Sequence, residues 1–264
     1  MEPNLEVLSQ LPTAAARSTP ILFVHGAWQG AWCWQEHFLP YFALHGYGAH
    51  ALSFRGHGNS AGRERLRWSS IADYVQDVAQ VARRLPKPPI LVGHSMGGLV
   101  VQKYLEQGAA PAAVLMASLP PSGAIATVLQ TIAHRPLVFL RMNLSLSLYP
   151  IVATPKLARD LLFSSAMPED QFERHYVRLQ DEAYRAFLDM LLLNLPRPAR
   201  VKLQPLILGA EKDAVFSVRQ INATARAYRT RAEIFPDMAH EMMLEDGWRA
   251  VADRILQWLG ERGL

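Results

Sequence analysis

Residues 90–100 read ILVGHSMGGLV, and this stretch decides the expected fold. A continuous apolar run, typical of a buried parallel strand, stops at Gly93, and apolar residues resume after the glycines that follow Ser95. Gly93 and Gly97 let strand and helix pack closely around a tight turn. The G-x-S-x-G pattern between a strand and a helix predicts a nucleophile elbow, with the Ser95 hydroxyl exposed above the sheet. His94 points to the opposite side of the strand and is expected to be structural.

Five further apolar runs have the continuous character of buried strands. They span residues 20–26, 48–54, 112–118, 204–210 and 231–237. Segments between most of these runs are typical of helices, namely residues 69–85, 96–108 and 247–263. The alternation predicts an α/β fold with a mostly parallel, doubly wound sheet and helices on both faces.

The alternation stops in residues 119–200, which contain helix-like pieces cut by prolines and no convincing strand. We therefore expect a core formed by residues 1–118 and 201–264, with a helical cap or lid at residues 119–200. The simpler alternative is extra helices on the outside of the sheet. Leu, Met and Phe in this segment either pack against the core or line an apolar pocket beneath the cap.

The composition indicates one globular protein of 264 residues, 50% of them hydrophobic. A net charge of +4 is scattered along the chain without a basic, aromatic-interleaved stripe, so no nucleic-acid partner is expected. Cys33 is the single cysteine, which excludes an intramolecular disulfide.

The first residues lack the pattern of a signal peptide, and the longest apolar segment, residues 136–152, is interrupted by Arg141 and Asn143. We expect a cytoplasmic protein without a transmembrane segment.

A reactive serine needs a base, and the base needs an acid that orients it. On this architecture the chain order is serine, acid, histidine. Three histidines follow Ser95. His134 and His175 fall in the expected cap, where an exposed helix histidine is the ordinary explanation. His240 follows the last strand, on a loop at the sheet edge where Ser95 lies, and is the predicted general base.

The acid is expected after the penultimate strand, where Glu211 and Asp213 are both available. Asp213 is favoured because it lies a few residues beyond the strand with a helix following. Glu211, nearer the strand end, remains the alternative. Asp237 is only three residues before His240 and is expected to be a turn residue.

Backbone N–H groups are expected to form an oxyanion hole beside Ser95. Met96 begins the helix after the elbow, and Ala27, or alternatively Trp28, follows the first predicted strand. Trp28 and Trp32 lie in or beside the loop that follows the first predicted strand, and both are candidates for an aromatic wall of the substrate pocket.

Five motifs, taken in order, resemble the α/β-hydrolase superfamily over nearly the whole chain. They are HGAW (25–28), FRGHGNSAG (54–62), GHSMGG (93–98), GAEKD (209–213) and MAHEMM (238–243). The resemblance implies a serine carboxylesterase-like or lipase-like member.

The N-terminal motif HGAWQGAWCW is also similar to the start of the plant methylesterase and hydroxynitrile lyase group. The lyases carry a threonine where this chain has Gly26 and a lysine where it has Glu241, which counts against cyanohydrin cleavage. Dehalogenases and epoxide hydrolases of this fold use an aspartate nucleophile, and Ser95 argues against them.

The predicted function is hydrolysis of carboxylic esters of apolar acyl or aryl groups through an acyl-enzyme. The substrate is a small, hydrophobic ester, and neither a metal nor an organic cofactor is required. The same side chains also suit cleavage of an amide, thioester, lactone or C–C bond, or perhydrolysis. A non-catalytic ligand receptor is the alternative from a different class, and a whole Ser, Asp and His set argues against it.

Overall fold

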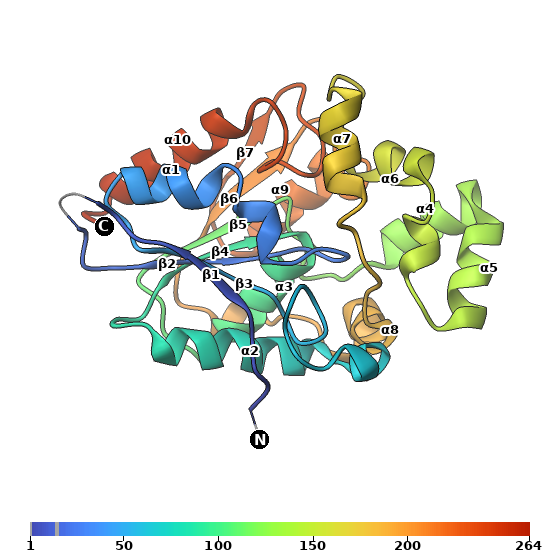
Figure 1. Cartoon of the computed structure of the whole chain (residues 1–264), viewed down its shortest axis with the longest axis horizontal. Helices are drawn as coiled ribbons and strands as arrows, with labels where there is room; N and C mark the ends of the chain where they lie inside the picture. Colours follow the sequence, from blue (N-terminus) through green and yellow to red (C-terminus); the bar gives the residue numbers. More distant parts are fainter. Residues whose placement is uncertain (1, 14–15) are drawn as a thin grey trace.

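The computed structural model describes residues 2–13 and 16–264, which form a seven-stranded sheet (Figure 1). The strands are β1 (Val7–Gln10), β2 (Ile21–Val24), β3 (Ala49–Leu52), β4 (Ile90–His94), β5 (Ala113–Met116), β6 (Leu206–Ala210) and β7 (Ala232–Phe235). Their order in the sheet is β1-β3-β2-β4-β5-β6-β7. Every neighbouring pair is parallel except β1 with β3, so the predicted mostly parallel sheet is confirmed.

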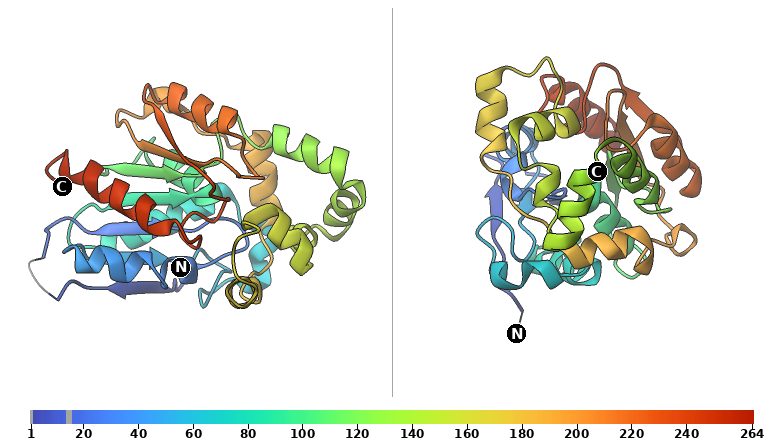
Figure 2. Two further views of the ribbon diagram at one scale, coloured as in Figure 1. Left: turned by 90° about the horizontal axis from the view of Figure 1, so that it is seen from above. Right: turned by 90° about the vertical axis from the view of Figure 1, so that its right-hand side faces the viewer.

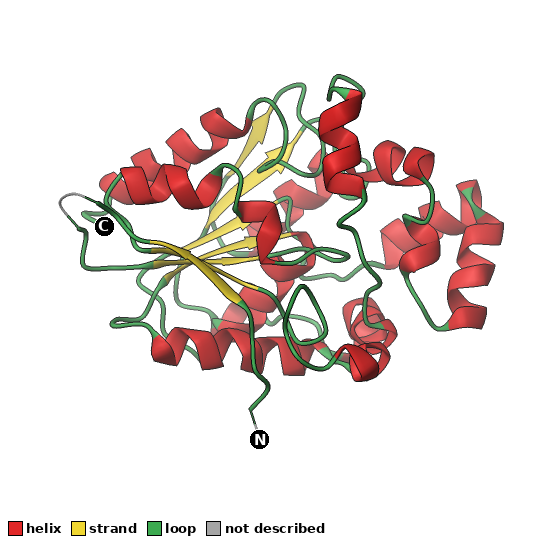
Figure 3. Ribbon diagram, viewed as in Figure 1, coloured by secondary structure: helices red, strands yellow, loops and turns green. Residues whose placement is uncertain are grey.

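Helices cover both faces of this sheet, which explains why its central strands are apolar throughout (Figure 3). The core helices are α1 (Phe38–Leu44), α2 (Ile71–Arg84), α3 (Ser95–Tyr104), α9 (Val218–Ala227) and α10 (Trp248–Gly260), with short 3-10 helices η1 (Ala31–Trp34) and η2 (Arg63–Trp68). In Figure 1, α1 and α10 lie above the sheet and α2 lies below it. The predicted α/β-hydrolase architecture is confirmed.

The strand order reverses at β2, because β3 pairs with one side of β2 and β4 with the other. Ligand sites of open α/β sheets lie outside the carboxyl ends of the strands at such a reversal. The turns that follow β2 and β4 therefore meet at this edge, and these turns carry Gly26 and Ser95.

Two details differ from the sequence predictions. The edge strand β1 was not predicted, since two of its four residues are partly buried, the other two are exposed, and they do not form a continuous apolar run. The helix expected over residues 96–108 ends at Tyr104. The cap residue is Leu105, and Gly108, the last residue of the expected range, lies beyond the helix under the ring of Tyr104, where a Cβ would lie 2.5 Å from Tyr104 Cζ.

Between β5 and β6 the described chain forms helices only. They are α4 (Ile125–His134), α5 (Pro136–Ser145), η3 (Tyr149–Ile151), α6 (Pro155–Leu162), α7 (Glu169–Tyr176), α8 (Tyr184–Leu188), the π-helical turn η4 (Asp189–Leu193) and η5 (Pro198–Arg200). The helices α4 and α5 stand at one end of the molecule, beyond the carboxyl ends of the strands (Figure 2). Within the described residues, no helix has the length and apolar character needed to cross a membrane.

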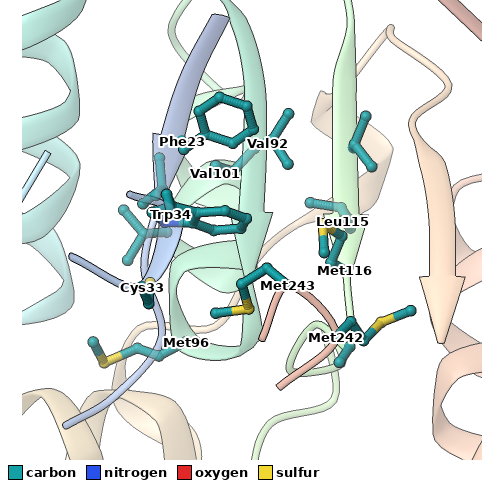
Figure 4. Close-up of a cluster of buried hydrophobic side chains, with 14 of the residues drawn as sticks. Phe23, Cys33, Trp34, Val92, Met96, Val101, Leu115, Met116, Met242 and Met243 are labelled. Atoms are coloured by element: carbon teal, nitrogen blue, oxygen red, sulfur yellow. The ribbon is translucent and has the colours of Figure 1, made fainter. Parts of the chain in front are cut away.

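One buried cluster joins the sheet to the loop after β7. Figure 4 shows Met242 and Met243, from this loop, in the same cluster as Trp34 and Met116. Both loop methionines are fully buried. Because they follow His240 by two and three residues, their packing fixes the backbone that carries this histidine.

Candidate active site

Ser95 is the first residue of α3 and has a φ of 52°, a left-handed conformation that is strained for a residue with a side chain. The flanking glycines make the turn possible. A Cβ on Gly93 would lie 2.7 Å from the carbonyl oxygen of Gly97, and a Cβ on Gly97 would overlap the carbonyl oxygens of Val24 and His25. The elbow thus has the close packing that its sequence pattern predicts.

Asp213 and His240 form a buried pair at the same edge of the sheet. His240 Nδ1 lies 2.8 Å from Asp213 Oδ2. Because an ionised carboxylate only accepts, Nδ1 carries the proton and Nε2 of the neutral ring is left as an acceptor. The other oxygen, Oδ1, accepts hydrogen bonds of 2.7 and 2.9 Å from the backbone N–H groups of Val215 and Phe216. Asp213 is therefore held from both sides.

The pKa of His240 is shifted by opposing effects. Burial of the ring lowers it, whereas the neighbouring Asp213 carboxylate, through its charge and its hydrogen bond, raises it, as does Glu241. The net direction is upward from the ordinary value of a histidine. This environment favours the imidazolium that a general base becomes when it accepts a proton.

The other acids and histidines considered in the sequence lie elsewhere. Glu211 Oε2 accepts a hydrogen bond of 3.1 Å from the backbone N–H of Asp237, whose carboxylate pairs with Lys212 at the surface. His134 is exposed at the end of α4. His175 was expected to be an exposed helix residue, but it is buried.

The loop after β2 approaches Ser95 as closely as a glycine permits. A Cβ on Gly26 would lie 3.0 Å from Ser95 Cβ. Trp28 has a φ of 64°, so the chain turns sharply directly after Ala27. Ala27, Trp28 and Met96 line one cavity together with Ser95, which is where an oxyanion hole would be needed.

That cavity encloses about 720 Å³ of unoccupied space, including its open mouth. Its lining is apolar except for one serine and two threonines, and consists of Ala27, Trp28, Ser95, Met96, Leu119, Ala124, Thr127, Val128, Thr131, Phe139, Met142, Leu148, Ile151, Leu161, Phe187, Met190, Val215 and Phe216. Ligand pockets in proteins are lined mostly by apolar side chains with a few polar groups, so the lining of this cavity suits a small hydrophobic molecule.

Of the two tryptophans expected in the pocket, the structure places one there. Trp28 lines the cavity, and its indole Nε1 donates to the carbonyl oxygen of Leu148 across 3.2 Å. Trp32 is not among the lining residues. Its ring stacks on His175 and lies 4.6 Å from the guanidinium carbon of Arg178, because η1 turns it towards the region around α7.

Some apolar residues of the helical segment line the pocket, as one of the two expectations had it, and others take neither of the expected roles. Phe139 and Met142 of α5 face the cavity. Leu137 and Leu144 of the same helix are 69% and 77% exposed. The segment therefore contributes a large share of the cavity wall and also presents apolar side chains outward.

The RGHGNS motif attaches the helical segment to the core. His57 Nε2 lies 3.0 Å from Glu182 Oε2, and both side chains are buried. Gln180 accepts from the backbone N–H of Gly58 and donates to the carbonyl oxygen of Gly56. These contacts assign the motif a structural role that the sequence alone did not reveal.

Glu241 is a further buried group at the site. A carboxylate oxygen of Glu241 and ring nitrogens of His94 and His240 lie within 4.8 Å of one another, a metal-like clustering within the described chain. Glu241 accepts a hydrogen bond from Gln29, and His94 Nε2 lies 2.9 Å from the carbonyl oxygen of His240, whereas His94 Nδ1 has no hydrogen-bond partner among the described residues. The carboxylate and one nitrogen of each ring thus belong to a hydrogen-bonded network.

The chain belongs to the alpha/beta hydrolase family, whose family model matches residues 21–254. Membership of this family supports hydrolase activity, and it agrees with the fold and with the hydrogen bond between Asp213 and His240.

Similar proteins include esterases and a lipase. Methylesterase 3 of Arabidopsis thaliana is 33% identical over 85 residues, which is 31% of this chain and 32% of that protein's length. A monoacylglycerol lipase of Mycolicibacterium smegmatis is 24% identical over 235 residues, 85% of this chain and 82% of the lipase. A Mycobacterium tuberculosis protein assigned provisionally as a non-heme bromoperoxidase superposes with a TM-score of 0.79 at 21% identity, over 99% of this chain and 97% of that one. The last similarity shows the fold alone.

Proposed function

We propose that this chain is a serine hydrolase that cleaves carboxylic esters of apolar acyl or aryl groups. The observation that carries the proposal is the buried hydrogen bond between Asp213 and His240 at the sheet edge that holds Ser95. The names of the similar methylesterase and monoacylglycerol lipase support an ester substrate.

In the proposed reaction, Ser95 Oγ attacks the ester carbonyl carbon while His240 Nε2 takes the hydroxyl proton. Asp213 keeps the ring in the required tautomer and stabilises the imidazolium. The backbone N–H groups of Ala27 and Met96 donate to the developing oxyanion. The imidazolium returns its proton to the leaving alcohol. Water, deprotonated by His240, then attacks the acyl carbon. The bond from this carbon to Ser95 Oγ breaks, the imidazolium returns its proton to Oγ, and the carboxylic acid leaves.

The apolar cavity supports a hydrophobic acyl or aryl group as the part of the substrate that the protein binds. Residues 119–200 are proposed to act as a cap, because α4 and α5 contribute Thr127, Phe139 and Met142 to the cavity wall. An acyl chain placed against this wall loses its contact with water, which favours longer acyl groups over acetate.

The test is hydrolysis of p-nitrophenyl esters from acetyl to palmitoyl by the wild type, by Ser95→Ala and by Ser122→Ala, an exposed serine, as a matched control. We expect turnover in the wild type and the control, a loss of more than about 10³-fold in Ser95→Ala, and an optimum beyond acetyl. Near wild-type activity in Ser95→Ala would contradict the assignment. An optimum at acetyl would remove the support for an apolar acyl group.

Intact-mass labelling with an organophosphonate provides a second readout. Labelling of the wild type without ester turnover would indicate a reactive serine that acts on another substrate. Amides, thioesters, lactones, C–C substrates and perhydrolysis would then be tested. Absence of both labelling and turnover would favour a ligand receptor.

A further inference from the structure

The side chain of Gln29 connects the loop after β2 to the loop after β7. Gln29 is fully buried; its Oε1 accepts a hydrogen bond of 3.2 Å from the backbone N–H of Gly26, and its Nε2 donates to Glu241 Oε2. Gly26 directly precedes Ala27, the proposed oxyanion donor. Glu241 directly follows His240, the proposed base. One amide therefore joins the two loops whose separation sets the reacting geometry.

Glu241 is itself firmly held. It is 1% exposed, and its backbone N–H donates to the carbonyl oxygen of Leu162, the last residue of α6, across 3.1 Å. Its carbonyl oxygen accepts from the N–H of Leu244 across 2.7 Å. Because the backbone of the loop after β7 is fixed, the Glu241 carboxylate is a rigid acceptor for the hydrogen bond from Gln29 in the loop after β2.

We propose that Glu241 is a positioning residue, which through Gln29 holds the Gly26–Ala27 backbone at the correct distance from His240. The inference rests on the proposed function and extends it to a residue that does not touch the substrate. Gly26 has no side chain with which to fix its own position, and its close approach to Ser95 leaves no room for one. An anchor has to come from elsewhere in the loop, and Gln29 supplies it.

The position matters because oxyanion donors act over a narrow distance, about 2.7–3.1 Å from the oxygen. The charge of the Glu241 carboxyl has a second effect, which is on the pKa of His240. The groups that face the Glu241 carboxyl are His94, His240, Asp213 and Glu245, with the Cys33 thiol also near. Burial raises the pKa of Glu241 to about 7, so this carboxyl changes its charge near neutral pH, and in its ionised form it raises the pKa of His240.

Two substitutions separate the hydrogen bond from the charge. Glu241→Met removes both, whereas Glu241→Gln removes the charge and keeps an oxygen that can accept from Gln29. We expect Glu241→Met to lower kcat by about tenfold or more with KM within about twofold, since one displaced oxyanion donor costs up to about 10²–10³-fold. Glu241→Gln retains most of the plateau kcat but moves the acid limb of the pH profile to lower pH.

The matched control is Glu245→Gln. Glu245 is a buried carboxyl four residues further on, which accepts a hydrogen bond of 2.8 Å from the backbone N–H of Ser164. The loss of the Glu245 carboxylate is expected to leave the plateau kcat unchanged, because Glu245 makes no contact with Gln29 or Gly26. If Glu241 had a purely structural role, Glu241→Met and Glu241→Gln would both have a lower thermal stability, and the kcat of the folded protein would be unchanged.

Two readouts do not depend on ester turnover: the rate of phosphonate labelling of Ser95, and the titration of His240 followed by NMR. Slower labelling of Glu241→Met and a lower pKa of His240 in Glu241→Gln support the inference even when the ester assignment fails. Wild-type labelling rates in a folded Glu241→Met, or an unchanged His240 titration in Glu241→Gln, overturn it.

Discussion

The imidazole of His94 and the backbone carbonyl of His240 are joined by a hydrogen bond of 2.9 Å. A carbonyl oxygen only accepts, so Nε2 of His94 carries the proton. Its Nδ1 is buried and has no hydrogen-bond partner among the described residues. Burial, with His240 nearby, lowers the pKa of His94 well below the ordinary value and keeps the ring neutral. The residue before the proposed nucleophile thus holds the backbone of the proposed base.

Replacing His94 with phenylalanine keeps a ring of similar size and removes the donor. A buried carbonyl that loses its partner costs about 1–3 kcal/mol, so the loop that carries His240 should be displaced and the protein destabilised. We expect a lower melting temperature and a kcat reduced by about tenfold or more (a penalty of 1.4 kcal/mol corresponds to tenfold). Thermal unfolding and steady-state kinetics check this. Unchanged turnover would show that His94 does not position His240.

The substitution Asp213→Asn should leave the fold intact and reduce turnover strongly. An amide in place of the carboxylate can donate to His240 Nδ1 and so favours the wrong tautomer, an effect of about 10⁴-fold in the serine proteases. The matched control is Asp237→Asn, which removes an exposed carboxylate paired only with Lys212 and should leave kcat unchanged. Equal kcat values for the two variants would make Asp213 dispensable.

The substitution Gly26→Ala tests how closely the loop after β2 must approach the elbow. The added Cβ would lie 2.9 Å from His94 Nδ1 and 3.0 Å from Ser95 Cβ, so the loop has to move. Such overpacking typically costs about 1–3 kcal/mol, and we expect lower kcat and lower stability. Gly260→Ala is the control, because a Cβ there meets nothing within 4 Å. Wild-type kcat in Gly26→Ala would contradict the close approach.

The buried carboxyl of Glu241 predicts that stability falls as the pH rises through neutrality. Burial raises its pKa to about 7, so between its ordinary value and 7 the folded state binds more protons than the unfolded state, and stability decreases with pH in that range. The shift corresponds to at most about 3.4 kcal/mol. Urea unfolding at pH 5 and pH 8 should show Glu241→Gln gaining stability relative to the wild type at the higher pH. The prediction is refuted if the difference in unfolding free energy between Glu241→Gln and the wild type is the same at pH 5 and pH 8.

The sequence was informative where a short motif and a general rule of topology sufficed. The turn around Ser95 is local, and the carboxyl ends of parallel strands meet at one edge, so His240 and Asp213 could be placed without coordinates. The structure confirms the fold and brings Asp213 and His240 into hydrogen-bonding distance. Their roles in catalysis stay predictions.

The features that were missed depend on contacts between distant parts of the chain. Gln29 and Glu241 are 212 residues apart, and no local pattern links them. Trp32 was assigned to the pocket because it lies beside the predicted oxyanion loop in the sequence, but the 3-10 turn η1 directs its ring elsewhere. His175 is buried by side chains from other elements, such as Trp32 and Phe163, which helical periodicity within α7 does not reveal.

The helical segment leaves the sheet after β5 and returns to it at β6, and these two strands are hydrogen-bonded neighbours. Neighbouring strands lie only about 4.8 Å apart, so the chain departs and re-enters side by side. The entropic cost of closing such an excursion grows slowly with its length. Evolution can therefore lengthen, shorten or exchange residues 119–200 while the sheet, the elbow and the histidine loop persist. Under the proposed function, the segment that binds the acyl group and the loops that break the ester bond are therefore separate parts of the chain.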